Sequence, residues 1–259
     1  MLVTILEQFK NSGYQPVCYG QCWVFSAVLV TLLRTMGIPA RSVTNYSSAH
    51  DTDNTMTIDH YKDENNEDVH FEDSSDSIWN FHVWNECWLN RPDLPAGQGF
   101  DGWQAVDSTP QEASGGLSQC GPCPVKAIYD GKTYINYDTA FVFAEVNADT
   151  CYWLVDKTGQ LKSLLHRSRS HVGKKVLTTE PGAGVFTSKD ITRNYKPIDE
   201  TEEHTKVFNR AFSYARNRPD MRRLMFNTPE IPVKLGNFPI YSAREHPIGA
   251  REQTSDVRE

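Results

Sequence analysis

Three residues of this sequence could together perform nucleophilic catalysis, namely Cys22, His82 and Asp107. Cys22 begins the apolar run CWVFSAVLVTLL. A thiol at the start of a helix lies near unsatisfied backbone N–H groups and the positive end of the helix dipole, which stabilise the thiolate. A catalytic cysteine also needs a histidine that takes its proton and a third group that orients the imidazole. His82 and Asp107 could supply both functions.

Each of the three residues also has a structural interpretation. A cysteine within an apolar helix is more often a packed core residue than a nucleophile. His82 stands in the aromatic segment WNFHVWNECW and could be a hydrogen-bonded core residue, while Asp107 could cap the Ser-Thr-Pro turn that follows it. Residue types and spacing alone leave both interpretations open.

The first element that must position the nucleophile is a helix, which we predict over Gln21–Met36. Gly37 stands where a left-handed residue is favoured after a helix, and Pro39 follows closely. Apolar residues occupy nearly every side of this segment, so we expect a central, buried helix rather than a surface one.

The second element is a pair of aromatic-rich strands, predicted over Trp79–Leu89 and Gly102–Asp107 and joined by the turn-forming stretch NRPDLPAGQGFDG. If the strands pair as a hairpin, His82 and Asp107 can stand side by side within reach of the helix start. The order Cys, His, Asp along the chain suits a papain-like arrangement. The predicted fold class is therefore α+β, with the cysteine-bearing helix packed on an antiparallel sheet.

The remaining elements complete one domain. We expect residues 1–216 to form the catalytic core and residues 217–259, which show no sustained periodicity, to be a poorly ordered linker or part of another domain. Further strands are predicted at Ala40–Tyr46, Ala140–Val146, Thr150–Val155 and Lys174–Thr178, and a further helix at Glu203–Arg216.

Two clusters of oxygen-bearing residues could bind a hard cation. The segment Asp51–Asp76 carries ten Asp and Glu residues against one Lys. Calcium accepts irregular loops of carboxylates, hydroxyls and carbonyls. A solvated acidic face is the alternative interpretation. The candidate ligands are Asp51, Asp53, Thr55, Thr57 and Asp76 for one site, and Asn147, Asp149, Asp199 and Glu203 for the other.

Composition excludes several other classes of protein. The net charge of −7 comes without a basic stripe, so we expect no nucleic-acid partner. The longest apolar run is too short to span a bilayer, and the first ten residues do not resemble a secretory signal. Six cysteines in 259 residues do not require a disulfide scaffold, so we expect a cytoplasmic protein, with export without a signal peptide as an alternative. A zinc site built from the pairs Cys18/Cys22 and Cys120/Cys123 is a weaker possibility.

Five motifs, in order and at matching separations over residues 14–215, resemble the catalytic core of animal transglutaminases. They are YGQCWVFSAVLVTLLRTMGIPAR, NFHVWNECW, RPDL, GWQAVDSTPQE and FVFAEVNAD. The resemblance implies that Cys22 is the nucleophile, His82 the base and Asp107 its orienting group, with Trp79 a wall of the substrate tunnel.

The implied reaction is calcium-dependent acyl transfer. A protein glutamine side chain forms a thioester with the cysteine and releases ammonia, and a lysine or another primary amine then takes the acyl group to give an isopeptide crosslink. Both acidic clusters fall where the resemblance places calcium ligands, although Glu202 is an alternative to Asp199 or Glu203, and His204 stands where a glutamate is expected. The rival functions are a glutamine deamidase or cysteine protease with the same triad, and an inactive binding or scaffold form.

The resemblance also predicts that the chain is truncated at both ends. Only 21 residues precede Cys22, so the tryptophan with which the family stabilises the oxyanion has no counterpart here, and Trp23 is too close to the nucleophile to replace it. Loss of one oxyanion donor raises a reaction barrier by roughly 3–4 kcal/mol. We expect either an incomplete gene product or a natural short form.

Overall fold

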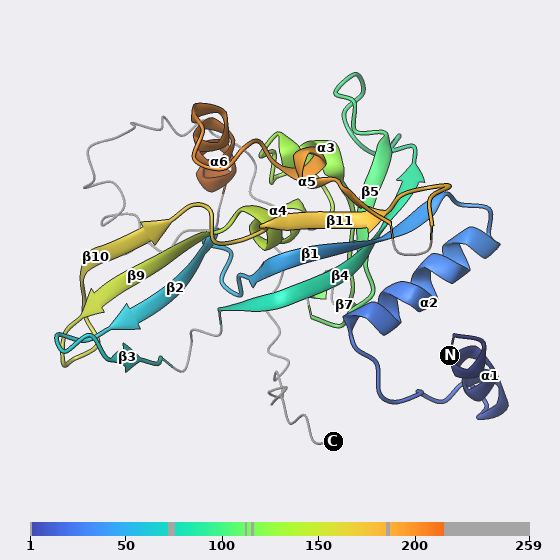
Figure 1. Ribbon diagram of the computed structural model, residues 1–259, viewed down its shortest axis with the longest axis horizontal. Helices are drawn as coiled ribbons and strands as arrows, with labels where there is room; N and C mark the ends of the chain where they lie inside the picture. The colour runs from blue at the N-terminus through green and yellow to red at the C-terminus, as the bar shows by residue number, and fades with distance from the viewer. Residues whose placement is uncertain (1, 72–75, 112, 115–116, 185–186, 215–259) are drawn as a thin grey trace.

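The computed structural model describes residues 2–71, 76–111, 113–114, 117–184 and 187–214 (Figure 1). Its helices are α1 (Leu2–Asn11), α2 (Cys22–Thr35), α3 (Val125–Tyr129), α4 (Thr139–Asn147), α5 (Thr192–Tyr195) and α6 (Glu202–Tyr214). Its strands are β1 (Ala40–His50), β2 (Thr57–Lys62), β3 (Asp68–Val69), β4 (Ser77–Leu89), β5 (Gly102–Asp107), β6 (Ala113–Ser114), β7 (Leu117–Ser118), β8 (Cys120–Pro124), β9 (Asp149–Val155), β10 (Leu161–Ser168), β11 (Lys175–Thr179) and β12 (Ser188–Asp190). The predicted remnant at 217–259 lies outside the described residues.

The largest sheet has the order β12-β11-β1-β4-β5-β8, and every neighbouring pair in it is antiparallel. Helices cover both of its faces. Asn85 in β4 donates a hydrogen bond to the backbone oxygen of Ser26 in α2, whereas Asn45 in β1, the register partner of His82, donates to Glu145 O in α4. Because neighbouring strand residues point to opposite faces, α2 and α4 lie on opposite sides of the sheet. The α+β prediction, with a helix on an antiparallel sheet, is confirmed.

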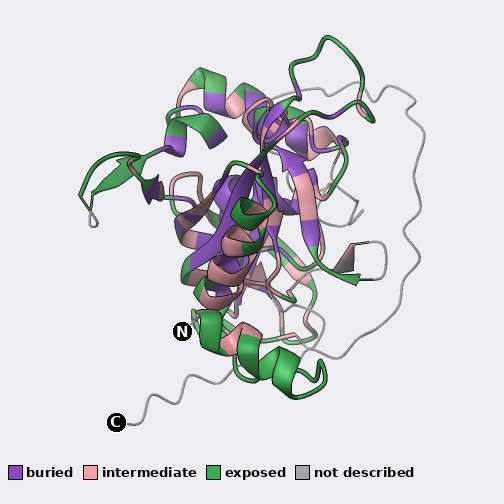
Figure 2. Cartoon of the chain, turned by 90° about the vertical axis from the view of Figure 1, so that its right-hand side faces the viewer, coloured by how far each residue is buried: buried purple, intermediate pink, exposed green. Residues whose placement is uncertain are grey.

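The helix that bears Cys22 was predicted correctly in position but not in burial. Only Cys22 and Ser26 are buried in α2, while Trp23 and Leu32 are 45% and 42% exposed. The helix packs one side against β4 and β1, and most of its other apolar residues are only partly buried (Figure 2). The expectation of a central helix is therefore wrong, because apolar residues on every side do not show which sides a sheet will cover.

The segment predicted as a strand at Ala140–Val146 is the helix α4. All but one of its nine residues are buried, so it carries no alternation between apolar and polar faces. A short, uniformly apolar run cannot be assigned to strand or helix from periodicity. The prediction followed its apolar content and was wrong, and α1 was missed altogether.

A second sheet forms where an acidic loop was expected. Its order is β10-β9-β2-β3, and β2 runs parallel to β9. Cys151 and Trp153 of β9 pack with Tyr61 of β2 into a small core of their own. This pairing places the loop between β1 and β2, which carries Asp51 and Asp53, at the junction of the two sheets (Figure 1).

The long connection between β4 and β5 is organised by Arg91, which is 6% exposed. Its guanidinium donates to both carboxylate oxygens of Asp93, to Gln104 Oε1, and to the backbone oxygens of Pro122 and Asn136, at 2.8–2.9 Å. A buried guanidinium needs this number of acceptors to offset its desolvation. Arg91 thereby ties β5, which ends in Asp107, to the loops around β8.

Candidate active site

Cys22 is the first residue of α2 and is buried, at 9% exposure. The helix begins there because Gln21 has extended backbone angles and its carbonyl accepts hydrogen bonds from the N–H groups of Val24 and Phe25. No acidic side chain lies in the first turn. The thiol is therefore placed at the positive end of the helix dipole, where an anion is stabilised.

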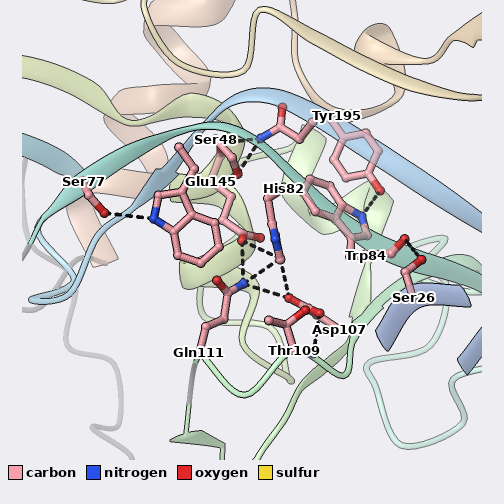
Figure 3. A network of polar contacts seen from close by, with 12 residues as sticks. Ser26, Ser48, Ser77, His82, Trp84, Asp107, Thr109, Gln111, Glu145 and Tyr195 are labelled. Carbon is pink, nitrogen blue, oxygen red and sulfur yellow. Dashed lines mark hydrogen bonds and ion pairs between the residues drawn. The ribbon is translucent and has the colours of Figure 1, made fainter. Parts of the chain in front are cut away.

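His82, near the middle of β4, is fully buried. Its Nε2 lies 2.6 Å from Asp107 Oδ2 at the end of β5 (Figure 3). The antiparallel pairing, which sets Asn85 opposite Val106, brings the end of β5 beside this part of β4. The other carboxylate oxygen, Asp107 Oδ1, accepts a hydrogen bond from the backbone N–H of Thr109 at 2.8 Å. Asp107 therefore both orients the imidazole and caps the turn that follows, so the two sequence-based interpretations of this residue hold together.

The ring of His82 also interacts with Cys22. Its Nδ1 has no hydrogen bond of ordinary geometry among the described residues and is the nitrogen left to face the thiol. Burial alone lowers the pKa of His82, but the hydrogen bond that His82 donates to Asp107, contact with Cys22 and the charge of Glu145 outweigh burial and raise it to about 10. The structure thus brings Cys22, His82 and Asp107 together in an arrangement that favours a thiolate beside an imidazolium.

Trp79 forms a wall beside the imidazole. Its ring meets His82 edge-on, with centroids 5.3 Å apart, and stacks on His50 at 5.4 Å. Its Nε1 donates to Ser77 Oγ at 3.2 Å, which fixes the plane of the indole. The residue predicted to line the substrate tunnel therefore lies against the base.

The first acidic cluster is assembled from the β1–β2 loop and the start of β4. Carboxylate oxygens of Asp51, Asp53 and Asp76 lie within 4.8 Å of one another. Burial, followed by the charges of the neighbouring aspartates, raises the pKa of Asp51 well above its usual range, and burial also raises that of Asp76. The hydroxyls of Thr55 and Thr57 lie beside them, 3.0 Å apart. These five predicted ligands are brought together.

Asp59, which the sequence did not single out, belongs to the same cluster. Its Oδ2 accepts a hydrogen bond from Thr57 Oγ1 at 2.9 Å, and its Oδ1 accepts one from Trp153 Nε1 at 2.6 Å. Burial raises the pKa of Asp59 to about 7, although both hydrogen bonds act in the opposite direction. The cluster therefore holds four carboxylates whose mutual repulsion a divalent cation would relieve.

The second cluster differs, because side-chain cations already neutralise its carboxylates. Asp149, which is fully buried, pairs through Oδ2 with Arg167, and Asp199 pairs with the buried ammonium of Lys196 at 2.8 Å. Both side-chain polar atoms of Asn147, and Oδ1 of Asp149, are buried without a hydrogen-bond partner among the described residues. Some oxygen ligands for a cation are therefore present, but the guanidinium of Arg167 and the ammonium of Lys196 lie beside them.

The remaining residues considered for the second cluster do not all lie within it. Glu203 is exposed and accepts a hydrogen bond from Tyr129 at 3.2 Å, and Glu202 pairs with Lys206 on the surface of α6. His204 is buried, with Nε2 3.7 Å from Asp199 Oδ1. The structure therefore does not bring the carboxylates of Glu202 and Glu203 into the buried cluster.

The zinc alternative receives no geometric support from the part of the chain that is described. The clusters of potential ligands found there contain no cysteine, and all six cysteines are free.

Comparison with known proteins agrees with this geometry. The model of the transglutaminase-like superfamily matches residues 6–108. The chain is 49% identical over 81% of its length to protein-glutamine gamma-glutamyltransferase 2 of Gallus gallus, and 46% identical over 90% of its length to protein-glutamine gamma-glutamyltransferase 4 of Homo sapiens. The crystal structure of red sea bream transglutaminase superposes with a TM-score of 0.70 at 46% identity, covering 81% of this chain and 31% of that one.

This chain carries a transglutaminase-like domain. It spans 29% and 34% of the lengths of the two curated relatives. The resemblance predicted from the five motifs, and the fold that it implied, are thereby confirmed. Within the described residues, none of the helices of this domain has the length and apolar character needed to cross a membrane.

Sequence reasoning missed two side chains that touch the triad of the transglutaminase-like domain, Gln111 and Glu145. Gln111 Nε2 lies 2.8 Å from both Asp107 Oδ2 and His82 Nε2, and 3.1 Å from Glu145 Oε1. A signal was present in each case. Gln111 follows the triad aspartate by four residues, and Glu145 is the single charged residue in the apolar run AFVFAEV.

Proposed function

We propose that this chain transfers the γ-glutamyl group of protein glutamine side chains to lysine or other primary amines. The observation that carries this proposal is the buried arrangement in which His82 bonds Asp107 at 2.6 Å and interacts with Cys22 at the start of α2. That arrangement supplies an activated thiol, a proton carrier and a group that orients it. The names of the relatives support acyl transfer from glutamine as the reaction.

The reaction would proceed in two half-steps. The Cys22 thiolate attacks the carboxamide carbon, and His82 as imidazolium gives its proton to the departing nitrogen, so that ammonia leaves and a thioester remains. An amine then attacks the thioester carbon and loses a proton to His82 while the C–S bond breaks. The products are an isopeptide bond, the thiolate and the imidazolium, which regenerate the starting pair.

Trp79 would favour the amine over water in the second half-step. Its indole covers one edge of the His82 ring and stacks on His50, which leaves less room for water beside the base. Hydrolysis of the same thioester would instead make the chain a glutamine deamidase. Exclusion of water is thus the feature that would separate the two outcomes.

We propose that calcium binds the first acidic cluster, where the donor set fits it. Asp51, Asp53, Asp59 and Asp76 offer hard oxygen ligands. The pKa values of Asp51, Asp59 and Asp76 are raised, mainly by burial and in part by the charges of neighbouring aspartates, and a bound cation would favour their charged forms. Calcium would neutralise these carboxylates and hold Asp76, which directly precedes β4, against the aspartates of the β1–β2 loop. Asn147, Asp149 and Asp199 would hold a second ion only if the paired ammonium and guanidinium groups moved away.

The test is incorporation of a labelled primary amine into a glutamine-containing protein, measured with the whole chain and with Cys22→Ala, with calcium and with a chelator. We expect incorporation only with Cys22 and calcium both present. Ammonia release without amine incorporation would identify a hydrolase. Equal signals from both chains would show that Cys22 does not catalyse the reaction and would leave a binding or scaffold role.

A further inference from the structure

His82 is faced by two buried carboxylates rather than one. Glu145, in α4, is 3% exposed, and its Oε1 lies 3.7 Å from His82 Nε2, the same ring nitrogen that Asp107 contacts from β5 at 2.6 Å. The two carboxylates reach this nitrogen from different elements, one at the end of a strand and one on the helix that packs on the same face of the sheet as His82. The triad as usually drawn uses only the first of them.

Gln111 joins the two carboxylates. Its side-chain amide donates to Asp107 Oδ2 at 2.8 Å and to Glu145 Oε1 at 3.1 Å (Figure 3). A primary amide has two N–H bonds, so donation to both carboxylates leaves none for His82 Nε2, which lies 2.8 Å from the same amide nitrogen. The amide thus holds both carboxylates around one edge of the imidazole and fixes the position of each relative to the other.

Two carboxylates buried this close together need a cation, because isolated buried anions are strongly unfavourable. The titratable groups that face His82 are Asp107 from β5, Glu145 from α4, Cys22 from α2 and His50 from β1. His50 is the neutral partner in this set, since burial lowers its pKa. The imidazolium of His82 is then the cation that both carboxylates share.

We propose that Glu145 is a positioning residue that keeps His82 in the imidazolium form and, through Gln111, holds Asp107 against the ring. This inference rests on the proposed acyl transfer, in which His82 must carry a proton before the thiolate attacks. His82 has three anionic neighbours before the reaction: the Cys22 thiolate, Asp107 and Glu145. When the thiolate attacks, its charge is consumed, so His82 gives up its proton more readily to the departing ammonia. The two carboxylates remain and restore its affinity for the proton that the amine then releases.

The perturbation that tests this proposal is Glu145→Gln, which removes the charge while an amide oxygen can still accept the hydrogen bond from Gln111. The matched control is Glu86→Gln. Glu86 is a buried carboxylate of the same strand as His82, but it pairs with Arg41 and Tyr195 instead. Glu145→Asp, which keeps the charge, is the conservative variant expected to restore the wild-type behaviour at least in part.

Two measurements read the state of His82 without amine incorporation. The first is NMR titration of the imidazole in a Cys22→Ser background, which prevents coupling to a titrating thiol. With the Coulomb energy at 3.7 Å discounted for a protein-like dielectric, Glu145→Gln should lower the pKa of His82 by about one to three units. The second is the rate of alkylation of Cys22 by iodoacetamide as a function of pH. In Glu145→Gln, the pH at which the Cys22–His82 ion pair is lost should be lower by a similar amount.

An unchanged titration of His82 in Glu145→Gln, or an equal shift in Glu86→Gln, would overturn the proposal. Should Glu145→Gln fail to fold, the Cys22→Ser chain alone still decides, because its His82 must stay protonated beyond pH 8. Titration near the ordinary value of about 6.5 would contradict the role of the second carboxylate. Failure of amine incorporation with a shifted His82 pKa would instead count against the proposed function alone.

Discussion

The raised pKa of His82 predicts how the stability of the fold should depend on pH. The folded value is about 10, and the ordinary value is 6.5. A group whose pKa is raised by folding stabilises the folded state fully below the unfolded value, and that stabilisation is lost as the pH rises through the folded value. Between these limits the folded chain binds one more proton than the unfolded chain. The free energy of unfolding should therefore fall with rising pH.

The magnitude follows from linkage. The slope is about 1.4 kcal/mol per pH unit for one proton. Integrated from the folded and unfolded values, the protonation of His82 contributes about 4 kcal/mol at pH 7 and about 1.5 kcal/mol at pH 9. Cys22→Ser removes any contribution of the thiol to this pH dependence.

The assay is urea unfolding from pH 6.5 to 10.5 of Cys22→Ser and of Cys22→Ser combined with His82→Gln. Subtracting the two curves cancels the titrating groups that do not interact with His82. The difference should fall by about 2.5 kcal/mol between pH 7 and pH 9 and flatten above pH 10. A difference that stays constant across this range would refute the assignment of a protonated His82 in the folded state.

Three further predictions concern other parts of the chain. Gly173→Ala should lower the free energy of unfolding by at least about 2 kcal/mol, measured by chemical denaturation, because Gly173 has a φ of +61° and an added Cβ would collide with the backbone oxygen of Val146. Arg91→Leu should cost roughly 3–5 kcal/mol in the same measurement, since it leaves four groups without their buried donor; a loss below 1 kcal/mol would contradict the role of Arg91. Asp76→Asn should weaken calcium binding at least about tenfold by titration calorimetry, whereas Glu202→Gln, on the exposed surface of α6, should leave it unchanged.

Local sequence patterns were sufficient to predict a helix or strand wherever its own residues mark its limits. The helix at Cys22 has an extended residue before it and Gly37 with a φ of +79° after it, so its limits were predicted to within a residue. The strands β4 and β5 are short-range partners with alternating aromatic residues, and their pairing was predicted for that reason. Residues 140–146 failed because burial on all sides removes the periodicity that distinguishes a helix from a strand.

The amino-acid sequence by itself predicted the triad only through the resemblance of five motifs to transglutaminases, since residue types and spacing left a structural interpretation open for Cys22, His82 and Asp107. It also fixed the carboxylates of the β1–β2 loop, because they follow one another along the chain. Tertiary structure alone decided that Glu145 and Gln111 join His82, since α4 must pack against β1 to bring Glu145 there. It also decided the electrostatics, because a pKa depends on burial and on charges that lie close in space from distant parts of the chain.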